Sequence, residues 1–272
     1  MLNESGFKGT FFVIPGRVSE TVEDAEKRKD DKRAWGTITW DELKEMARQG
    51  HEIANHTWTH PNLTGLTPAE VVEQIVKAKD GIREHIGAAP LTLAFPFNAS
   101  TPEIQAEALK QHVAYRAYQK GAGGKDTVES LNAWADKQVK EGTWGVLMTH
   151  GIATGYAAFT DPEIFREHLN YVKGRDKEIW VDTFANVARY EKEREDAKLS
   201  VSSAVSGKVV CVLAGSLDSA VYDVPLTLVI EASGASSARA ERSGQDLPVR
   251  VGNDKLQMDV IPGAGTINIT WQ

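Results

Sequence analysis

The sequence has 272 residues, of which 41% are apolar and 25% are charged, and its formal net charge is −7 at pH 7. Phosphate binding needs a basic face, so this charge argues against a nucleic-acid partner, and no apolar run approaches the roughly 20 residues of a membrane-crossing helix. The single cysteine, Cys211, excludes an internal disulfide, and no basic segment followed by an apolar core marks a signal peptide in this chain.

Short apolar runs alternate with amphipathic segments from residue 9 to about 195, which predicts βα units around a parallel sheet. Six strands are expected: GTFFVI (9–14), HEIAN (51–55), LTLAF (91–95), VAYRAY (113–118), TWGVLMTH (143–150) and EIWVDT (178–183). Helices are expected over 39–50, 67–87, 101–111, 128–141, 161–174 and 184–194. Thr39 caps the first of these helices, and Thr67 with Glu70 forms the capping-box pattern of the second. The segment MLNESGFK resembles the last turn of a helix, so the chain is expected to begin partway through its first βα unit, inside a longer parent.

A change of composition after residue 195 predicts a second domain over residues 196–272, with residues 1–195 forming the first. Short alternating or β-branched runs split by Gly, Pro, Ser and Asp are typical of a small antiparallel β-sandwich. These runs are LSVSSAV, GKVVCVLAG, VPLTLVIEA, LPVRVG, KLQMDVI and GTINITWQ. Trp271 and Tyr222 have two interpretations, glycan stacking or core packing, and core packing is favoured.

Two histidines four residues apart, His56 and His60, follow HEIAN directly. If they lie on a helical turn, this spacing lets both rings converge on one ion at roughly 2.0–2.1 Å, although a pair of loop histidines that bind nothing is the alternative. His150 ends TWGVLMTH, where it would ligate a metal, move a proton, or serve only as structure. Pro96 and Phe97 follow LTLAF at the same end of the sheet, and plain loop structure explains them equally well.

In chain order, GFKGTFFVIPGRV, ITWDELKEMARQGHEIANHTWTHPNLT, AFPFNAST, WGVLMTHGI and IWVDTFANVARY resemble the polysaccharide deacetylase family, the NodB-like carbohydrate esterases. The resemblance covers residues 1 to about 192 and implies a distorted (β/α) barrel, here followed by the sandwich. It implies a divalent ion, zinc first with cobalt, nickel or manganese as alternatives, held by an aspartate and by His56 and His60. It also implies that activated water attacks the acetyl carbonyl, that a second aspartate acts as base, and that His150 protonates the leaving group. Pro96 and Phe97 match the family's substrate-binding loop.

The sequence departs from the family pattern in three places. The first-strand motif Thr-Phe-Asp-Asp-Gly, with both aspartates, has no match, and it would lie upstream of Met1. Ala94 stands where the family has an arginine that orients the base, and LNAWADK only loosely matches a segment that offers another aspartate. The barrel is therefore expected to lack its first strand. Glu52, Asp161, Asp182 or a partner chain are alternative sources of a carboxylate.

The expected function is metal-dependent removal of N- or O-linked acetyl groups from an acetylated polysaccharide of the chitin, peptidoglycan or xylan type. The alternative is a carbohydrate-binding relic without catalysis. A serine esterase is disfavoured because the sequence contains no G-x-S-x-G motif. We further expect a longer parent protein that is extracellular or periplasmic, and a homo-oligomer formed through the incomplete sheet.

Overall fold

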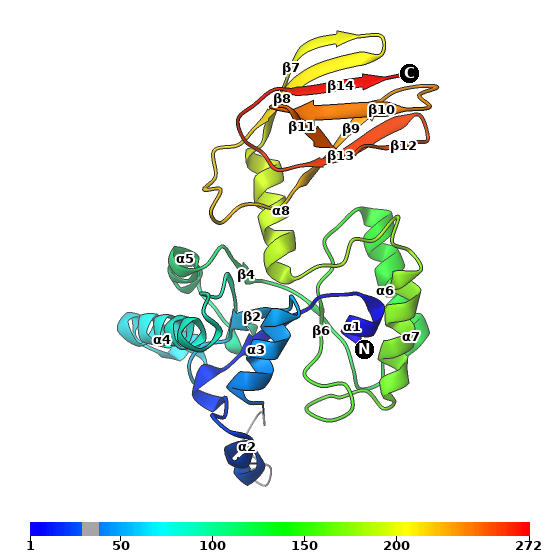
Figure 1. Cartoon of the computed structure of the whole chain (residues 1–272). Helices are drawn as coiled ribbons and strands as arrows, with labels where there is room; N and C mark the ends of the chain where they lie inside the picture. Colours follow the sequence, from blue (N-terminus) through cyan, green and yellow to red (C-terminus); the bar gives the residue numbers. More distant parts are fainter. Residues whose placement is uncertain (29–37) are drawn as a thin grey trace. The chain divides into compact units, whose positions relative to one another are not determined.

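The computed structural model describes residues 1–28 and 38–272 and divides into two compact units, Met1–Ala185 and Asn186–Gln272 (Figure 1). The division falls near the start of helix α8 (Phe184–Asp196), so most of this helix belongs to the second unit. The composition change at residue 195 lies at the far end of the same helix.

A four-stranded parallel sheet, in the order β1-β2-β3-β4, lies at the centre of the first unit. Its strands are β1 (Thr10–Val13), β2 (Glu52–Asn55), β3 (Thr92–Ala94) and β4 (Ala114–Arg116). The register pairs Val13 with Asn55, Asn55 with Leu93, and Ala94 with Arg116. The carboxyl ends of all four strands therefore meet at one edge of the sheet, and so do the residues that follow them.

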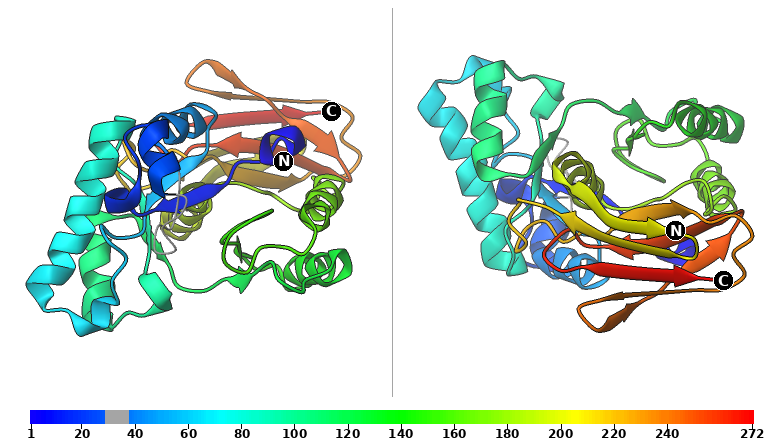
Figure 2. Two further views of the ribbon diagram at one scale, coloured as in Figure 1. Left: turned by 90° about the horizontal axis from the view of Figure 1, so that it is seen from below. Right: turned by 90° about the horizontal axis from the view of Figure 1, so that it is seen from above.

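Most helices of the first unit lie where the sequence predicts them. The helices are α1 (Leu2–Ser5), α2 (Val22–Arg28), α3 (Trp40–Arg48), α4 (Pro68–Ile86), α5 (Pro102–Gln111), α6 (Val128–Glu141) and α7 (Pro162–Lys173). Thr39 and Glu42 form a complete capping box at α3, and Thr67 and Glu70 form another at α4. Helix α4 packs beside both α3 and α5 (Figure 2). The predicted helices are confirmed, and α2 is an additional helix that the sequence pattern does not predict.

The apolar face predicted for α4 is the centre of the core. Ile75 packs with Leu93 of β3 and Ala108 of α5, and Ile82 packs with Leu43 of α3. All five side chains are completely buried. Truncating one of the larger ones to alanine costs about 2–5 kcal/mol in cores of this kind. This packing fixes the helices on the sheet and holds the strand ends in place.

Two of the six predicted strands differ from the structure. In TWGVLMTH only β6 (Leu147–Met148) is a strand, and it pairs with β5 (Lys120–Gly121) in a separate two-stranded sheet. The prediction of a strand at 178–183 is wrong. The backbone N–H groups of Glu178 and Ile179 both donate to the carbonyl of Arg175, so a local turn takes the hydrogen bonds that a ladder would need.

The second unit contains two antiparallel sheets, in the orders β11-β10-β14-β8-β7 and β12-β13-β9. The strands are β7 (Lys198–Val205), β8 (Lys208–Ala214), β9 (Leu226–Glu231), β10 (Ala238–Arg242), β11 (Gln245–Leu247), β12 (Arg250–Gly252), β13 (Lys255–Val260) and β14 (Ile267–Trp271). Leu256, Met258, Ile267 and Ile269 form a fully buried core, and Trp271 packs against it. The predicted β-sandwich is confirmed, and Trp271 takes the core-packing role. The hairpin of β10 and β11 is not predicted because its sequence is mostly polar.

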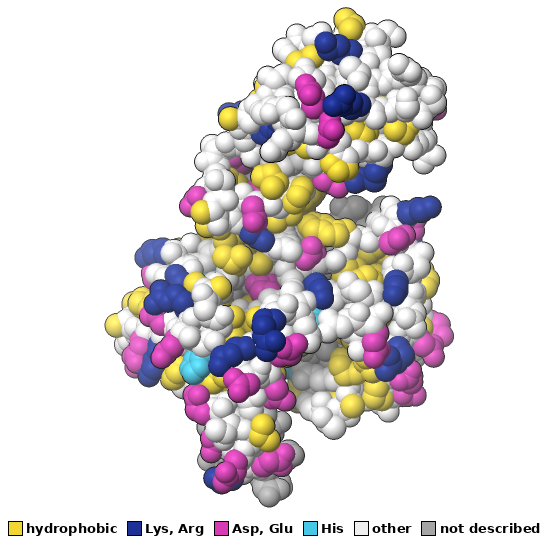
Figure 3. Space-filling model, in the orientation of Figure 1, with side chains coloured by type: hydrophobic (Ala, Val, Ile, Leu, Met, Phe, Trp, Pro, Cys, Tyr) yellow, Lys and Arg dark blue, Asp and Glu magenta, His cyan; other side chains and the backbone are white. Residues whose placement is uncertain are grey.

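The surface carries charges of both signs. On the face shown in Figure 3, acidic and basic side chains are interspersed. Several pairs lie one helical turn apart, as Lys44 and Asp41 do at 3.0 Å, and exposed pairs of this kind stabilise a helix by about 0.2–0.5 kcal/mol. No helix in the described ranges combines the length and the apolar character that crossing a bilayer requires.

A buried histidine makes the stability of the first unit depend on pH. His112 is 7% exposed; its Nδ1 donates to the carbonyl of Ala108 at 3.1 Å, and its Nε2 accepts from Asn55 Nδ2 at 3.2 Å. Burial lowers the pKa of His112 from 6.5 to about 4. The unfolded ring therefore takes up a proton below pH 6.5 while the folded ring stays neutral. We expect the contribution of His112 to the free energy of unfolding to be fully present above pH 6.5. It should fall by about 3 kcal/mol as the pH approaches 4.

Urea titrations of the wild type and the His112→Gln variant at pH 7 and pH 4.5 measure this contribution. The variant is expected to have a lower free energy of unfolding than the wild type at pH 7. It should lose less of this free energy than the wild type does between pH 7 and pH 4.5. The same loss in both proteins would contradict the assignment to His112.

Candidate functional site

A buried asparagine organises the loop that follows β2. The Nδ2 of Asn55 donates to the carbonyl of Ile75 at 3.0 Å and to His112, and its Oδ1 accepts from the backbone N–H of Thr57 at 2.8 Å. The Oγ1 of Thr57 then accepts from the backbone N–H of His60 at 3.1 Å. The completely buried side chain of Asn55 thus connects strand β2, helix α4 and the loop of residues 56–60, which is called the histidine loop below.

The loop reaches this shape through a strained backbone. Thr57 and His60 have φ angles of 66° and 64°, in the left-handed region that residues with a side chain rarely adopt. Each such residue costs about 1–3 kcal/mol and persists only where the surroundings enforce it. The rings of His56 and His60 lie 4.7 Å apart between centroids, at 77° to each other. Of the two local structures that the sequence allows, a loop and a helical turn, the structure has the loop, and its strained backbone brings the two rings together.

The proton on His56 is fixed by a backbone carbonyl. Its Nδ1 donates to the carbonyl of Ala94 at 2.7 Å, which leaves the Nε2 lone pair as the acceptor. Burial is the main cause that lowers the pKa of His56 to about 4; the charges of His60, Arg116 and His150 act in the same direction, and the hydrogen bond to the Ala94 carbonyl opposes them. Near neutral pH the ring is therefore uncharged, the form that binds a metal ion.

The third predicted histidine, His150, lies within electrostatic range of the other two. Burial is the main cause of the lowered pKa of His60, and the charges of Arg17 and His150 add to it. His150 lowers the pKa of His56 as well. Its own ring is exposed and meets the ring of Tyr156 edge to face, 5.2 Å between centroids. His150 therefore lies close enough to affect both rings electrostatically, but in the described part of the chain the three histidines do not form a group that could hold a metal ion.

The two residues predicted to contact substrate lie in the turn η3 (Pro96–Asn98) after β3, in different environments. Pro96 is buried, whereas the side chain of Phe97 is 66% exposed. The ring of Phe97 lies 4.9 Å from the ring of His60 between centroids, and its backbone has a φ of 59°. Phe97 therefore lies against His60 at the exposed edge of the histidine cluster, the name used here for His56, His60 and the nearby His150. Pro96 is buried and supports the turn from inside.

The carboxylates named as alternative ligands lie elsewhere. Glu52 accepts hydrogen bonds from the hydroxyls of Thr10 at 2.7 Å and Thr92 at 2.5 Å, and both threonines begin strands, so Glu52 ties the amino ends of the sheet. Asp161 and Asp182 accept from nearby backbone N–H groups. Within residues 1–28 and 38–272, no three His, Cys, Asp or Glu side chains form a group that could hold a metal ion.

His56 and His60 fit two of the nitrogen ligands that zinc prefers, because their rings adjoin and His56 presents Nε2. An anionic third ligand is not found among the described side chains. The pair alone is an incomplete metal centre.

Arg116 is a member of the site that the motif search did not single out. It is the last residue of β4 and is 8% exposed, and its guanidinium carbon lies 5.1 Å from the centroid of the Phe12 ring. Its charge acts on His56. The signal in the sequence is a cation that closes an apolar strand at the same sheet edge as the histidines.

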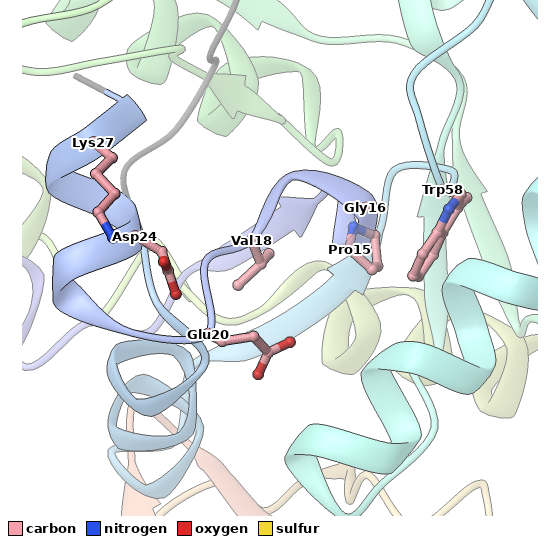
Figure 4. Close-up of a pocket in the computed structure, with 7 residues that line it drawn as sticks. All are labelled: Pro15, Gly16, Val18, Glu20, Asp24, Lys27 and Trp58. Carbon is pink, nitrogen blue, oxygen red and sulfur yellow. The ribbon is translucent and has the colours of Figure 1, made fainter. Parts of the chain in front are cut away.

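A separate pocket of about 420 Å³ adjoins the histidine loop (Figure 4). Its described lining residues are Pro15, Gly16, Val18, Glu20, Asp24, Lys27 and Trp58. Trp58 lies between His56 and His60 in the sequence, and in Figure 4 its ring stands beside Pro15 and Gly16. None of the three histidines is among these residues, so this pocket is distinct from the histidine cluster.

Gly16 permits a close approach between the turn η1 (Pro15–Arg17) and the histidine loop. Its backbone N–H donates to the carbonyl of Trp58 at 3.0 Å, and a Cβ at this position would lie 2.5 Å from the same oxygen. We expect Gly16→Ala to push the two segments apart and to lower the free energy of unfolding by about 1–3 kcal/mol. Urea denaturation measures the change. Gly65→Ala is the control, because nothing lies within 4 Å of a Cβ at that position, and equal losses in both variants would contradict the account.

Comparison with known proteins identifies the family. The family model described as polysaccharide deacetylase matches residues 1–116. The predicted resemblance to the polysaccharide deacetylase family is confirmed over these residues. A putative polysaccharide deacetylase from Mycobacterium smegmatis has the same fold, with a TM-score of 0.52 and 16% identity over 71% of this chain and 75% of that one. The predicted deacetylase-type α/β fold is confirmed.

Two curated relatives are much longer than the regions they share with this chain. A gellan lyase from a Bacillus species is 22% identical over 99% of this chain, which spans 12% of that protein. A chitooligosaccharide deacetylase from Bradyrhizobium sp. (strain ANU 289) is 36% identical over 73 residues, which make up 26% of this chain and 33% of that protein.

Proposed function

We propose that this deacetylase-family chain removes N- or O-linked acetyl groups from a polysaccharide in a metal-dependent hydrolysis. The observation that supports this proposal is the contact between the rings of His56 and His60 after β2, in a chain whose residues 1–116 match this family. Family membership points to an acetylated glycan as the substrate class. Chitin-like, peptidoglycan and xylan chains are the candidates, and a place of action outside the cytoplasm or in the periplasm belongs to the same proposal.

His56 and His60 would hold the divalent ion, zinc first with cobalt, nickel or manganese as alternatives. A carboxylate from beyond the described residues would complete the ligand set. When bound, the ion supplies Lewis acidity that polarises a carbonyl group and makes water a stronger acid. The hydrogen bond from His56 Nδ1 to Ala94 keeps that ring oriented, as outer partners of metal ligands do.

His150 would move the proton that the leaving group needs. Its exposed ring stands in the cluster and can donate to a departing nitrogen or oxygen of the sugar. Imidazole suits this task because its ordinary pKa lies near neutral pH. The exposed rings of Phe97 and Tyr156 adjoin His60 and His150, and we assign them the apolar faces of the sugar rings on either side of the acetyl group.

A carbohydrate-binding relic is the second candidate. The missing third ligand among the described residues favours it. It predicts saccharide binding without acetate release, whereas the proposed hydrolase predicts both.

Acetate release separates the two functions. The chain is loaded with zinc and incubated in separate samples with chitin oligosaccharides, with peptidoglycan and with acetylated xylan. We expect release from at least one glycan, loss of release with a chelator, and recovery when zinc is returned. Binding without release in any arm would favour the relic, and full release by metal-free protein would overturn the metal dependence.

A further inference from the structure

The pocket of about 420 Å³ in Figure 4, called the Trp58 pocket below, has an apolar wall around one indole ring. The half-buried ring of Trp58 lies in a slot between two glycines: a Cβ on Gly16 would lie 3.2 Å from the ring, and a Cβ on Gly81 of α4 would lie 3.0 Å from it. Pro15 and Val18, both buried, continue the same wall. The two glycines let the indole pack closely, so the wall has a defined shape.

The Trp58 pocket lies on the other side of the histidine loop from the histidine rings. Trp58 packs against α4, where the Nζ of Lys77 lies 4.7 Å from the centroid of its ring, whereas His56 bonds to Ala94 of β3. The backbone still joins the two places, because Trp58 is two residues from His56 and its carbonyl accepts from the N–H of Gly16 at 3.0 Å. A ligand in the pocket would therefore lie beside the histidine site without entering it.

The opposite wall of the pocket is acidic. Its charged side chains are Glu20, Asp24 and Lys27, and in Figure 4 the side chain of Glu20 extends towards Pro15 and Trp58. The Nζ of Lys27 lies 2.9 Å from the carboxylate of Glu23, which compensates its charge. In the described part of the chain, Glu20 has an ion pair only with His85, at 4.0 Å, and Asp24 bonds to a hydroxyl and to no cation. The pocket thus combines an apolar wall with two carboxylates that lack a permanent cationic partner.

We propose that the Trp58 pocket binds a sugar unit that carries a free ammonium group, as in a glucosamine chain from which acetyl groups have been removed. Carboxylates accept hydrogen bonds from an ammonium group and from hydroxyls, and the bonds to the ammonium are strengthened by charge. The apolar wall takes the ring of the sugar, as aromatic side chains do in ligand pockets. The volume lies within the roughly 300–1,000 Å³ of small-molecule sites.

This inference rests on the proposed function and narrows its substrate to polymers of amino sugars. Removal of an N-linked acetyl group leaves an ammonium group on the sugar, whereas removal of an O-linked one leaves a neutral hydroxyl. The Trp58 pocket would hold a unit that is already deacetylated while another unit of the same chain occupies the histidine site. A xylan chain would gain nothing from the two carboxylates.

Calorimetric titration of the metal-free chain tests the pocket without turnover. The ligands are the tetramers of glucosamine, N-acetylglucosamine and xylose, and the peptide tetralysine. We expect the glucosamine tetramer to bind most tightly, because it alone combines a sugar ring with a positive charge. The double variant Glu20→Gln/Asp24→Asn is expected to weaken its binding by about 3- to 10-fold, the effect of losing two exposed ion pairs.

Two further variants separate charge from misfolding. Lys27→Gln removes the only cation of the described lining and should strengthen binding of the glucosamine tetramer by about twofold, a gain that damage to the fold would not produce. Asp41→Asn is the matched control: Asp41 lies outside the pocket, is 86% exposed and pairs with Lys44 at 3.0 Å, so its loss should leave the affinity unchanged. The glucosamine tetramer should also raise the melting temperature of the wild type more than that of the double variant.

Equal affinity for the glucosamine tetramer in the wild type and the double variant, or no binding by the wild type, would overturn the inference. Tetralysine or the xylose tetramer binding as tightly would overturn the assignment of the ligand. Acetate release from chitin oligosaccharides without glucosamine binding in the pocket would remove this inference and leave the proposed function. Glucosamine binding with no acetate release from any glycan would leave the pocket and remove the proposed function.

Discussion

His150→Asn is expected to lower kcat for acetate release by about 10²- to 10⁴-fold, the usual contribution of a positioned general acid. The ring of His150 is exposed, rests against Tyr156 and lowers the pKa values of His56 and His60, and the proposed function gives it the proton for the leaving group. Asparagine retains a polar side chain of similar reach and cannot deliver a proton near neutral pH. Initial rates at saturating zinc and substrate measure the loss.

The division between kcat and zinc affinity shows whether His150 acts on a proton or on the metal. The account predicts a large loss in kcat with zinc affinity close to that of the wild type. His85→Asn is the control, because the ring of His85 stacks on Trp40, 4.0 Å between centroids, and takes no part in the cluster. Full kcat in His150→Asn, or an equal loss in His85→Asn, would remove the general-acid role.

Asn55→Ala is expected to lower the free energy of unfolding by about 3–5 kcal/mol. The substitution leaves the Nε2 of His112 and the backbone N–H of Thr57 without their partner, and it removes the bond that the Ile75 carbonyl accepts in addition to its helical one. Such groups cost about 1–3 kcal/mol each when they are left unsatisfied. Urea denaturation at pH 7 measures the total.

The same substitution should also disturb the histidine loop, because Asn55 holds Thr57 and Thr57 holds His60. We expect zinc affinity to fall together with stability. Asn62→Ala is the matched control: Asn62 is exposed, and its side chain accepts from the N–H and hydroxyl of Thr64. Its loss should be about 1 kcal/mol or less. Similar losses in the two variants would contradict the central place of Asn55.

The helices of this chain could be predicted closely because their signals are local. The capping boxes at Thr39 and Thr67 determine where α3 and α4 begin, and each box involves residues only three apart. Both boxes form in the structure. The approximate positions of His56 and His150 could also be predicted, since each follows an apolar run and parallel strands bring their carboxyl ends together. In these places the physical cause of the structure lies in neighbouring residues.

The remaining features depend on distant residues. The segment EIWVDT has the composition of a strand but no ladder partner in the described sheets, so its backbone turns back to Arg175. Asn55 and Arg116 look like ordinary strand residues in the sequence, and their importance comes from what surrounds them: α4 and His112 for Asn55, Phe12 and the histidine cluster for Arg116. The left-handed backbone of His60 likewise comes from the hydrogen bond to Thr57 and not from a residue preference.

Zinc binding to wild type and to the variants His56→Gln and His60→Gln, measured by equilibrium dialysis and elemental analysis, tests the central claim most directly. His51→Gln is the control, because the Nδ1 of His51 already accepts from the backbone N–H of Gly9 at 3.1 Å. The account predicts one zinc ion per chain in the wild type and in His51→Gln, and at least tenfold weaker binding in each of the other two variants. Undiminished zinc binding in His56→Gln and His60→Gln would contradict a metal centre at this pair.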